Sequence, residues 1–439
     1  MGSAGRITMS HRSTDPVPSA CGTWTSPIGA QMVAAAALRL GSVSVEGDTV
    51  YWVEGRPGEG GRNVIVKRSA DGRITDATPE RANVRTRVHE YGGAAYAVSG
   101  GTIYYVEFTD QRLYKLAPGA APVPLTPPGE WFYADFCVDA PRGRLLSVRE
   151  DHTVEGREAV TTLVSVPISG PPTAGQVVFS GHDFYSTPRL SSDSARLSWL
   201  AWRHPQMPWD GTELWMADLS GDGSIERPRV IAGGEGESIF QPGWSPDGTL
   251  YFVSDRTGWW NLYRLRDAVE PVHPMDAELG RPQWQIGAST WAFADASRLV
   301  VSFAEKGRWH LATLDVATGA MREIGSRVEP ADSMAATATS AVLVGGSTSA
   351  PDAVVRVDLA SGAVETLRAS SEVCVDSSFL SPPEAIEFPT DGGLTAHAFY
   401  YPPRNPAFTP LPGERPPLIV VAHGGPTAAA TPRDRKSVV

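Results

Sequence analysis

Cysteine is scarce in this sequence, and the few residues present are far apart. The 439 residues contain three, Cys21, Cys137 and Cys374. An odd number at these distances argues against a disulfide framework and a C-x-x-C metal site, and it fits a reducing compartment. The histidines show no ligand spacing such as H-E-x-x-H. We therefore expect a cytoplasmic protein without a metal or another cofactor.

Long apolar runs and basic clusters are missing as well. No run approaches the roughly 20 apolar residues that span a bilayer, and residues 1–20 lack the apolar core of a signal peptide. The formal net charge of −11 opposes binding to a phosphate backbone. We expect neither a membrane nor a nucleic-acid partner, and we expect a disordered leader over residues 1–20.

Tryptophan, glycine and proline are abundant, with 13, 44 and 37 residues. Aromatic residues mixed with turn formers favour many short strands over long helices. A strand-like segment that follows turn residues recurs at intervals of about 40 to 55 residues. The seven segments read GDTVYWV, GGTIYYV, RGRLLSV, SARLSWL, DGTLYFV, ASRLVVS and TSAVLV.

Each segment is followed by a second strand that ends in a turn, so the repeating unit is a small antiparallel sheet. Such a sheet cannot bury both of its faces alone, and radial packing of several sheets solves that problem. We predict a mostly β protein with a seven-bladed β-propeller over residues 38–381. An array of β-sandwiches is the competing interpretation.

The fifth repeat is the clearest. It reads WSPDGTLYFVSDRTGWWNLY, from Trp244 to Tyr263. Residues 246–248 predict a tight turn, and residues 251–253 are expected to alternate between the two faces of the sheet. Of the two tryptophans at 259 and 260, one is expected to pack between blades.

The pattern changes after residue 381. Residues 384–403 predict a hairpin around Asp391-Gly392-Gly393, and a proline-rich linker follows. The continuous apolar run LIVVA at residues 418–422 is typical of a strand buried on both faces of an α/β sheet. We therefore expect the first strands of an incomplete α/β-hydrolase domain over residues 382–432.

The apolar run ends in His423-Gly424-Gly425-Pro426. Glycine lets the backbone turn sharply and present an N–H group without a Cβ in the way. In acyl transfer such a donor stabilises the oxyanion of the tetrahedral intermediate. The candidate oxyanion donor is the N–H of Gly425, with Gly424 as the adjacent alternative. A plain Gly-Pro loop is the other interpretation.

Taken together, these stretches resemble the prolyl oligopeptidase family of serine peptidases, in particular its acylaminoacyl-peptidase and dipeptidyl-aminopeptidase-like branch. The resemblance lies in TWTSPI (Thr23–Ile28), RVHEYGGAAY (Arg87–Tyr96), MPWDGTELW (Met207–Trp215), the fifth repeat and VVAHGGPT (Val420–Thr427). It implies a propeller that caps an α/β-hydrolase domain and admits short peptides. Residues 21–37 are then a segment that packs near the hydrolase domain. A homo-oligomer of the full-length enzyme belongs to the same expectation.

The catalytic Ser, Asp and His of that family all lie after the HGGP loop. This sequence has no G-x-S-x-G motif, so none of the three is assigned here. His423 shapes the loop in that family and is not a catalytic base. The segment TPRDRKSVV abandons the α/β pattern, and we expect residues 433–439 to be a non-native tail after a truncation of the gene.

Two propeller residues are candidates for substrate binding, Glu90 and Arg203. A carboxylate at position 90 could hold the free α-amino group of a peptide, or it could simply pair with Arg85 or Arg87. Arg203 lies in the long loop WRHPQMPWDGTELW together with His204 and Asp210. That loop either lines the inner opening or packs its aromatic residues between blades.

Two functions follow from these observations. The first is the N-terminal part of a serine peptidase that acts on short peptides through an acyl-enzyme and is inactive as the present chain. The second is a non-catalytic propeller that binds a peptide or a protein. The buried strand and the HGGP turn favour the peptidase, because a binding propeller needs neither.

Overall fold

The expected leader and the expected non-native tail fall mostly outside the described part of the chain. Residues 1–14, Cys374 and residues 434–439 belong to the parts that are not described. The computed structural model describes residues 15–34, 37–372 and 375–433.

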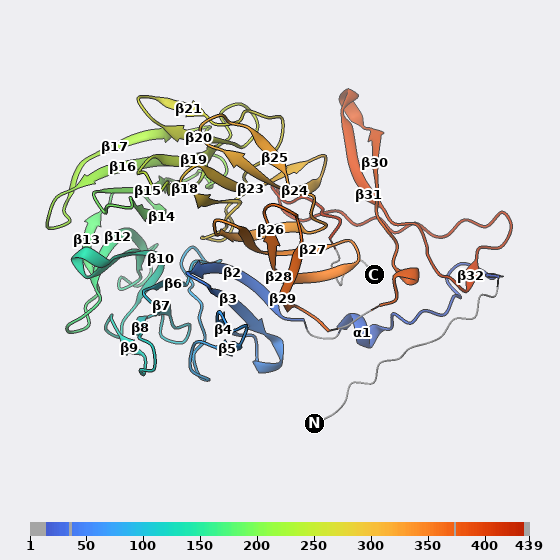
Figure 1. Cartoon of the computed structure of the whole chain (residues 1–439), viewed down its shortest axis with the longest axis horizontal. Helices are drawn as coiled ribbons and strands as arrows, with labels where there is room; N and C mark the ends of the chain where they lie inside the picture. Colours follow the sequence, from blue (N-terminus) through green and yellow to red (C-terminus); the bar gives the residue numbers. More distant parts are fainter. Residues whose placement is uncertain (1–14, 35–36, 373–374, 434–439) are drawn as a thin grey trace. The chain divides into compact units, whose positions relative to one another are not determined.

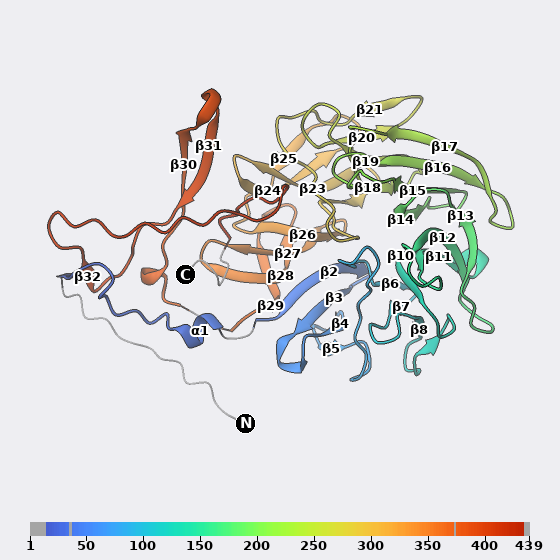
Figure 2. The ribbon, with the colours of Figure 1, turned by 180° about the vertical axis from the view of Figure 1, so that it is seen from behind.

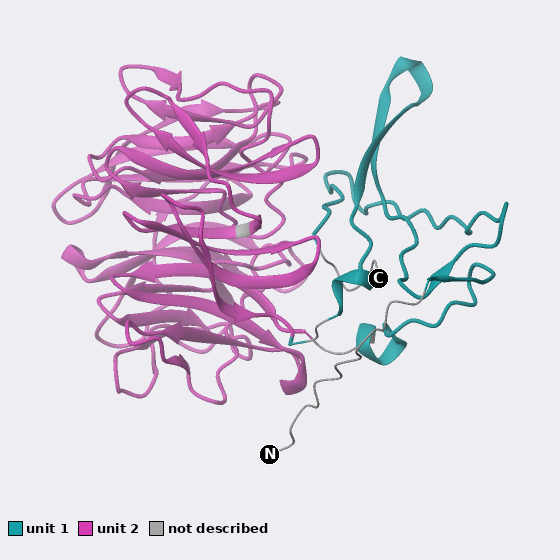
Figure 3. Cartoon of the chain, turned by 45° about the vertical axis from the view of Figure 1, so that its right-hand side comes forward, with its two compact units in different colours: residues 1–35, 372–439 teal, residues 36–371 magenta. Residues whose placement is uncertain are grey.

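Contacts divide the chain into two units, coloured in Figure 3. The larger unit is residues 36–371, and the smaller unit combines residues 1–35 with residues 372–439. The domain limits at residues 38 and 381 stay predictions, a few residues away from these divisions.

Seven four-stranded antiparallel sheets form the larger unit within its described residues, and each sheet uses four consecutive strands. Blades one to three contain β2 (Arg39–Glu46), β3 (Thr49–Arg56), β4 (Arg62–Arg68) and β5 (Ile74–Asp76); β6 (Tyr96–Ser99), β7 (Thr102–Val106), β8 (Leu113–Leu116) and β9 (Val123–Pro124); β10 (Trp131–Asp139), β11 (Arg144–Asp151), β12 (Val160–Pro167) and β13 (Gln176–Phe179). Blades four and five contain β14 (Phe184–Leu190), β15 (Arg196–Trp202), β16 (Glu213–Leu219) and β17 (Ile225–Gly233); β18 (Ile239–Trp244), β19 (Leu250–Ser254), β20 (Asn261–Leu265) and β21 (Val269–Pro271). Blades six and seven contain β22 (Trp291–Asp295), β23 (Arg298–Glu305), β24 (Arg308–Asp315) and β25 (Met321–Glu323); β26 (Glu329–Ala336), β27 (Ser340–Ser347), β28 (Ala350–Asp358) and β29 (Val364–Ala369). Two short 3-10 turns, Pro57–Glu59 and Ala140–Arg142, lie between strands.

The sheets follow one another around a ring, and the orange sheet of blade seven lies beside the blue sheet of blade one in both views (Figures 1 and 2). The first strands of neighbouring blades contact each other, so they are the innermost strands, next to the axis. The predicted seven-bladed β-propeller is confirmed, and the array of sandwiches is wrong.

Apolar side chains fill every interface between neighbouring blades. Seven buried clusters occur in the described residues, one for each interface of the ring. The fifth repeat shows how alternation achieves this: Tyr251 and Val253 face blade six, whereas Phe252 faces blade four. Of the adjacent tryptophans, Trp260 is buried in the cluster with blade six and Trp259 is 39% exposed. Each sheet therefore buries both faces against its neighbours.

The ring closes between blades seven and one without a shared sheet. Glu54 on β3 is fully buried, and its carboxylate accepts hydrogen bonds from Arg56 of its own blade and Arg368 of blade seven, at 3.0 and 2.7 Å. The indole of Trp52 also donates a hydrogen bond to it. Because blade one and blade seven come from opposite ends of the propeller sequence, this ion pair joins segments 314 residues apart.

A second set of contacts ties the innermost strands together. Most of these strands contain a β-bulge. At four bulges a non-glycine residue has a left-handed backbone, which needs support from its surroundings. These residues are Ser42, Asp135, Thr187 and Gln241. Two of them accept a hydrogen bond from the next blade: Asp135 from the N–H of Thr187 at 2.6 Å, and Gln241 from the N–H of Thr290 at 2.7 Å.

The smaller unit contains little regular structure among its described residues. Its helix α1 is Ala30–Ala34, and its 3-10 turns are Ser377–Phe379 and Asp391–Gly393. Strands β30 (Glu384–Pro389) and β31 (Thr395–Tyr400) form a hairpin, and β1 (Val17–Pro18) pairs in parallel with β32 (Phe408–Thr409). The hairpin turns at Asp391-Gly392-Gly393, as predicted.

Residues 21–37 were expected to pack near the hydrolase domain. Within the smaller unit, the N–H of Cys21 donates to the carboxylate of Glu414 at 2.9 Å, and the ring of Trp24 stacks on Phe408. Asn405 donates to the carbonyl of Thr25 at 2.9 Å. These contacts join the described part of the N-terminal segment to residues 405–414.

The expected buried strand at residues 418–422 is not formed. Leu418, Ile419, Val420 and Val421 have no regular secondary structure, and their side chains are 74–84% exposed. A central strand needs a hydrogen-bonded neighbour on each side and a cover on each face, and the described residues provide neither. The described helices also include none that is long and apolar enough to cross a membrane.

Ring closure through Glu54 generates a stability prediction. We expect Glu54→Gln to lower the free energy of unfolding by about 3 kcal/mol, because it leaves the partly buried guanidinium of Arg368 without its counter-charge and removes one of the carboxylates that pair with Arg56. Urea unfolding of the whole chain measures this change. Glu365→Gln is the matched control, since Glu365 bridges the same blades from a half-exposed position and is expected to contribute less than about 1 kcal/mol. Equal effects of the two substitutions would refute the role of Glu54.

Candidate functional site

Two loops meet across the propeller axis. The loop before β6 contains the motif HEYGG, and the loop before β22 contains residues 281–287. Gly93 and Ile286 form a parallel β-bridge, and the N–H of Ile286 donates to the carbonyl of Gly92 at 3.0 Å. Because these loops lead into blades two and six, which are not neighbours in the ring, the backbone crosses the central channel.

The crossing requires Gly93, and the fold of the HEYGG loop itself requires Gly92. A Cβ at Gly93 would lie 2.1 Å from the carbonyl oxygen of Ile286, and one at Gly92 would lie 2.4 Å from that of Thr86. Both glycines also have positive φ, at 107° and 67°, which L side chains rarely adopt. Their role is therefore a close backbone approach.

Aromatic rings cover the crossing. Tyr91, which is 53% exposed, meets Trp284 edge-on, with ring centroids 5.3 Å apart. Trp209 from blade four lies 4.3 Å from the same indole. The loop after β15 thus contributes Trp209 to the packing around the loop that leads into β22.

His89 lies at the base of this loop. Its ring contacts Phe184 and Trp202 edge-on at 5.4 and 5.3 Å, and its backbone has a φ of 54°. The Nε2 atom is buried and has no hydrogen-bond partner among the described residues. Loss of water around the ring lowers the pKa of His89 to about 4. The imidazole is therefore neutral at physiological pH.

Glu150 of blade three contacts His89, and it was not identified as a candidate residue from the sequence. Its carboxylate accepts a hydrogen bond from the backbone N–H of His89 at 2.8 Å and lies 3.1 Å from Nε2 of His152. Burial raises the pKa of Glu150 above its usual range. No local pattern in VREDHT indicates this role, because the contact joins residues 61 positions apart.

Glu90 directly follows His89 in the sequence but has a different environment. It is exposed, has a φ of 63°, and its carboxylate has no ion-pair or hydrogen-bond partner among the described residues. Arg85 and Arg87 were the alternative ion-pair partners for Glu90. Their guanidinium groups instead lie over the ring of Phe108, each 4.8 Å from its centroid. The carboxylate is thus available to a cationic group.

Arg203 is also exposed, in the turn after β15. It directly follows Trp202 in the sequence, and the ring of Trp202 contacts the ring of His89. Since Glu90 directly follows His89, the two charged residues are each next in sequence to one ring of this contact. No interaction joins the two charged groups directly. The other candidates of this loop shape the turn: His204 donates its N–H to Asp183, and Asp210 accepts from the N–H of Met207.

The HGGP segment belongs to the smaller unit. Gly424 and Gly425 are exposed, and Gly425 has a φ of 68° in a turn. Neither N–H donates to another described residue. This conformation leaves both donors open to a ligand. Across the described ranges, no group of three His, Cys, Asp or Glu side chains is arranged to hold a metal ion.

Solved structures place the chain in a family. It is 35% identical to puromycin hydrolase, with a TM-score of 0.89, over 96% of this chain and 67% of that one. It is 34% identical to a puromycin-hydrolyzing peptidase of Mycobacterium tuberculosis, with a TM-score of 0.88, over 95% of this chain and 66% of that one. The chain belongs to the prolyl oligopeptidase family of serine peptidases.

The chain spans about two thirds of the length of these puromycin-hydrolysing relatives. Prolyl oligopeptidase B from Galerina marginata, at 12% identity and a TM-score of 0.61, shares the fold over 84% of this chain. No family model matches the chain, and no curated protein matches it.

The axial crossing in this prolyl oligopeptidase family propeller can be tested at Gly93. We expect Gly93→Ala to separate the two loops, because the new Cβ overlaps the backbone of Ile286. The expected result is a loss of stability of about 2 kcal/mol or more and faster amide exchange at residues 91–93 and 284–286. Gly100→Ala is the control, since that glycine also has a positive φ but open space around its Cβ position. Protection that stays unchanged in Gly93→Ala would contradict the crossing.

His89 generates a pH prediction. A histidine whose pKa is about 4 in the folded chain and about 6.5 when unfolded binds a proton more readily in the unfolded state. The folded chain therefore loses stability as the pH falls from about 6.5 to 4. The pKa of Glu150 is raised in the folded chain, so Glu150 adds stability as the pH falls. Glu150 is present in both the wild type and the His89→Phe variant. We expect His89→Phe to reduce this loss, as measured by urea unfolding at several pH values. An unchanged pH profile would contradict the assignment.

Proposed function

We propose that this chain is the propeller and the beginning of the hydrolase domain of a serine peptidase that hydrolyses short peptides through an acyl-enzyme. The observation that carries the proposal is the likeness to puromycin hydrolases, which extends over nearly the whole chain. The acylaminoacyl-peptidase and dipeptidyl-aminopeptidase-like branch is the part of the family that the sequence stretches resemble. A cytoplasmic location, supported by the few separated cysteines, belongs to the same proposal.

In this proposal the N–H of Gly425 is one donor of the oxyanion hole, with Gly424 as its neighbour. A donor of this kind stabilises the negative charge on the tetrahedral intermediate by about 2.7–4 kcal/mol. Its open N–H and its positive φ of 68° support the assignment, because the donor must face a ligand rather than another strand. The chain contains no G-x-S-x-G motif, so we expect no hydrolysis by these 439 residues alone.

Glu90 is proposed to bind the α-amino group of the peptide. An exposed carboxylate without an internal partner can form a charge-assisted hydrogen bond with an ammonium group. Arg203, also exposed and without a partner, is proposed to bind a peptide carbonyl or carboxylate. The propeller restricts the substrates to short peptides, and the two loops that cross the axis support this restriction by narrowing the channel.

A binding and activity experiment tests the proposal. We expect the chain to bind alanyl-alanine amide in isothermal titration calorimetry, and Glu90→Gln to weaken this binding about tenfold, the loss expected for one hydrogen bond between charged groups. Acetylation of the peptide amine should have the same effect as the substitution. We expect no turnover of aminoacyl p-nitroanilides.

Glu158→Gln is the matched control, because Glu158 is an exposed glutamate in the loop between β11 and β12. If both substitutions changed binding equally, the role of Glu90 would be refuted. Turnover that a serine-directed fluorophosphonate abolishes would refute the expected inactivity of the chain.

A further inference from the structure

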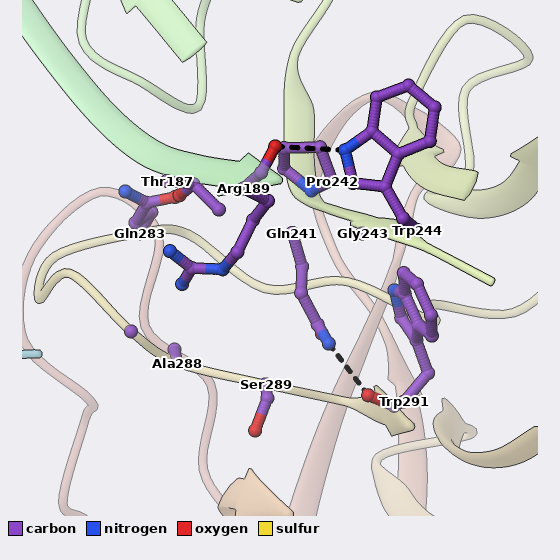
Figure 4. A pocket seen from close by; sticks show the side chains of 11 residues that line it. Thr187, Arg189, Gln241, Pro242, Gly243, Trp244, Gln283, Ala288, Ser289 and Trp291 are labelled. Carbon is purple, nitrogen blue, oxygen red and sulfur yellow. Dashed lines mark hydrogen bonds between the residues drawn. The ribbon is translucent and has the colours of Figure 1, made fainter. Parts of the chain in front are cut away.

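A cavity of about 260 Å³ lies among the innermost strands of blades four to six. Its walls come from β14, β18 and the loop that leads into β22, so it borders the propeller axis (Figure 4). Six of the residues that line it matter for the argument below. They are Arg189, Gln241, Pro242, Trp244, Ala288 and Trp291.

Arg189 is the cation of this cavity, and one of its three guanidinium nitrogens already donates hydrogen bonds within the chain. Its Nη1 atom donates to Oδ1 of the buried Asp135 and to the carbonyl of Pro188, both at 2.8 Å. The Nε and Nη2 atoms make no hydrogen bond with another described residue. The side chain is 34% exposed although its ion-pair partner is 1% exposed, because the rest of the guanidinium faces the cavity.

The unused edge of Arg189 has a defined chemistry. The N–H groups of Nε and Nη2 are parallel and coplanar, and this fork matches the two oxygens of a carboxylate. The ion pair with Asp135 fixes the orientation of the fork, since the other oxygen of Asp135 accepts the N–H of Thr187 at 2.6 Å. A ligand therefore meets a guanidinium that is already oriented.

Several other polar groups of the walls already have hydrogen-bond partners within the chain. The side-chain amide of Gln241 accepts from the N–H of Thr290 and donates to the carbonyl of Trp291, both at 2.7 Å. The indole of Trp244 donates to the carbonyl of Arg189 at 2.9 Å (Figure 4). Pro242, Ala288 and the two indole rings provide apolar surface.

A second donor in this wall has no partner. Trp291 is 4% exposed, and its Nε1 atom makes no hydrogen bond with any described residue. In Figure 4 this nitrogen lies on the side of the ring that faces Gln241. Buried donors are nearly always paired, so this indole adds an unpaired N–H group to a wall in which the fork of Arg189 is also open.

The charge of the cavity favours a monoanion. Asp135 offsets part of the charge of Arg189, so a phosphate dianion would keep an uncompensated charge away from water. Cys137 also lies near this ion pair, but burial raises the pKa of its thiol to about 12, and it stays neutral. We propose that this axial cavity binds a small organic carboxylate, which the open fork of Arg189 holds bidentately beside Pro242, Ala288 and the two indole rings.

Two ligands that differ only in charge test this inference, which is independent of the proposed peptidase activity. We expect N-acetylglycine to bind the whole chain in isothermal titration calorimetry, and N-acetylglycinamide to bind at least about tenfold more weakly. Neither probe has a free amine, so Glu90 does not contribute. Arg203→Gln is the control for the other exposed cation, and we expect it to leave the affinity for N-acetylglycine unchanged. Equal binding of the two, or binding of neither, would overturn the proposal. Tighter binding of inorganic phosphate than of N-acetylglycine would also overturn it.

A substitution locates the site. Arg189→Lys keeps a cation beside Asp135 but removes the fork, and we expect it to weaken N-acetylglycine binding at least about tenfold. Arg227→Lys is the matched control, because Arg227 pairs with Asp218 at an exposed position outside the cavity. Wild-type affinity in a folded Arg189→Lys protein would overturn the assignment. If that variant fails to fold, the comparison of acid and amide on the wild-type chain still decides.

Discussion

The propeller depends on hydrogen bonds between the innermost strands of neighbouring blades. A side chain at a bulge of one blade accepts the backbone N–H of its neighbour, as Asp135 does for Thr187 and Gln241 does for Thr290. Ser333 of blade seven accepts the N–H of Val43 in blade one at 2.6 Å, which continues the pattern across the closure. Because no strand is shared between blades, these contacts and the apolar clusters are what align seven separate sheets around one axis.

The same ring determines where polar groups become available. One nitrogen of Arg189 donates hydrogen bonds to Asp135 and to the carbonyl of Pro188, and the remaining N–H groups face the axial cavity. HEYGG illustrates the same division of roles, since Gly93 serves the crossing with Ile286 while Glu90 keeps its charge exposed. Residues next to one another in the sequence therefore have different tasks, one structural and one open to a ligand.

Much of the fold could be predicted because its signals are local. Turn residues, alternation and a regular repeat mark each blade, and the outcome at Tyr251, Phe252 and Val253 follows from the two-residue period of a strand. Less of the candidate site could be predicted from the sequence. Glu150 and Asp135 act through contacts 61 and 52 residues away, and a single sequence contains no sign of such pairs. The strand expected at residues 418–422 is not formed in this chain, because strand formation also needs hydrogen-bonded neighbours.

The sequence by itself determined the number of blades, the faces of their strands and the family resemblance, because each rests on patterns within one repeat or one motif. Only the tertiary structure decided that the ring closes through Glu54 and Arg368, that two loops cross the axis, and that the fork of Arg189 stays open. The physical reason is the same in each case. Those features are contacts between blades, and their partners are brought together by the closure of the ring rather than by their order along the chain.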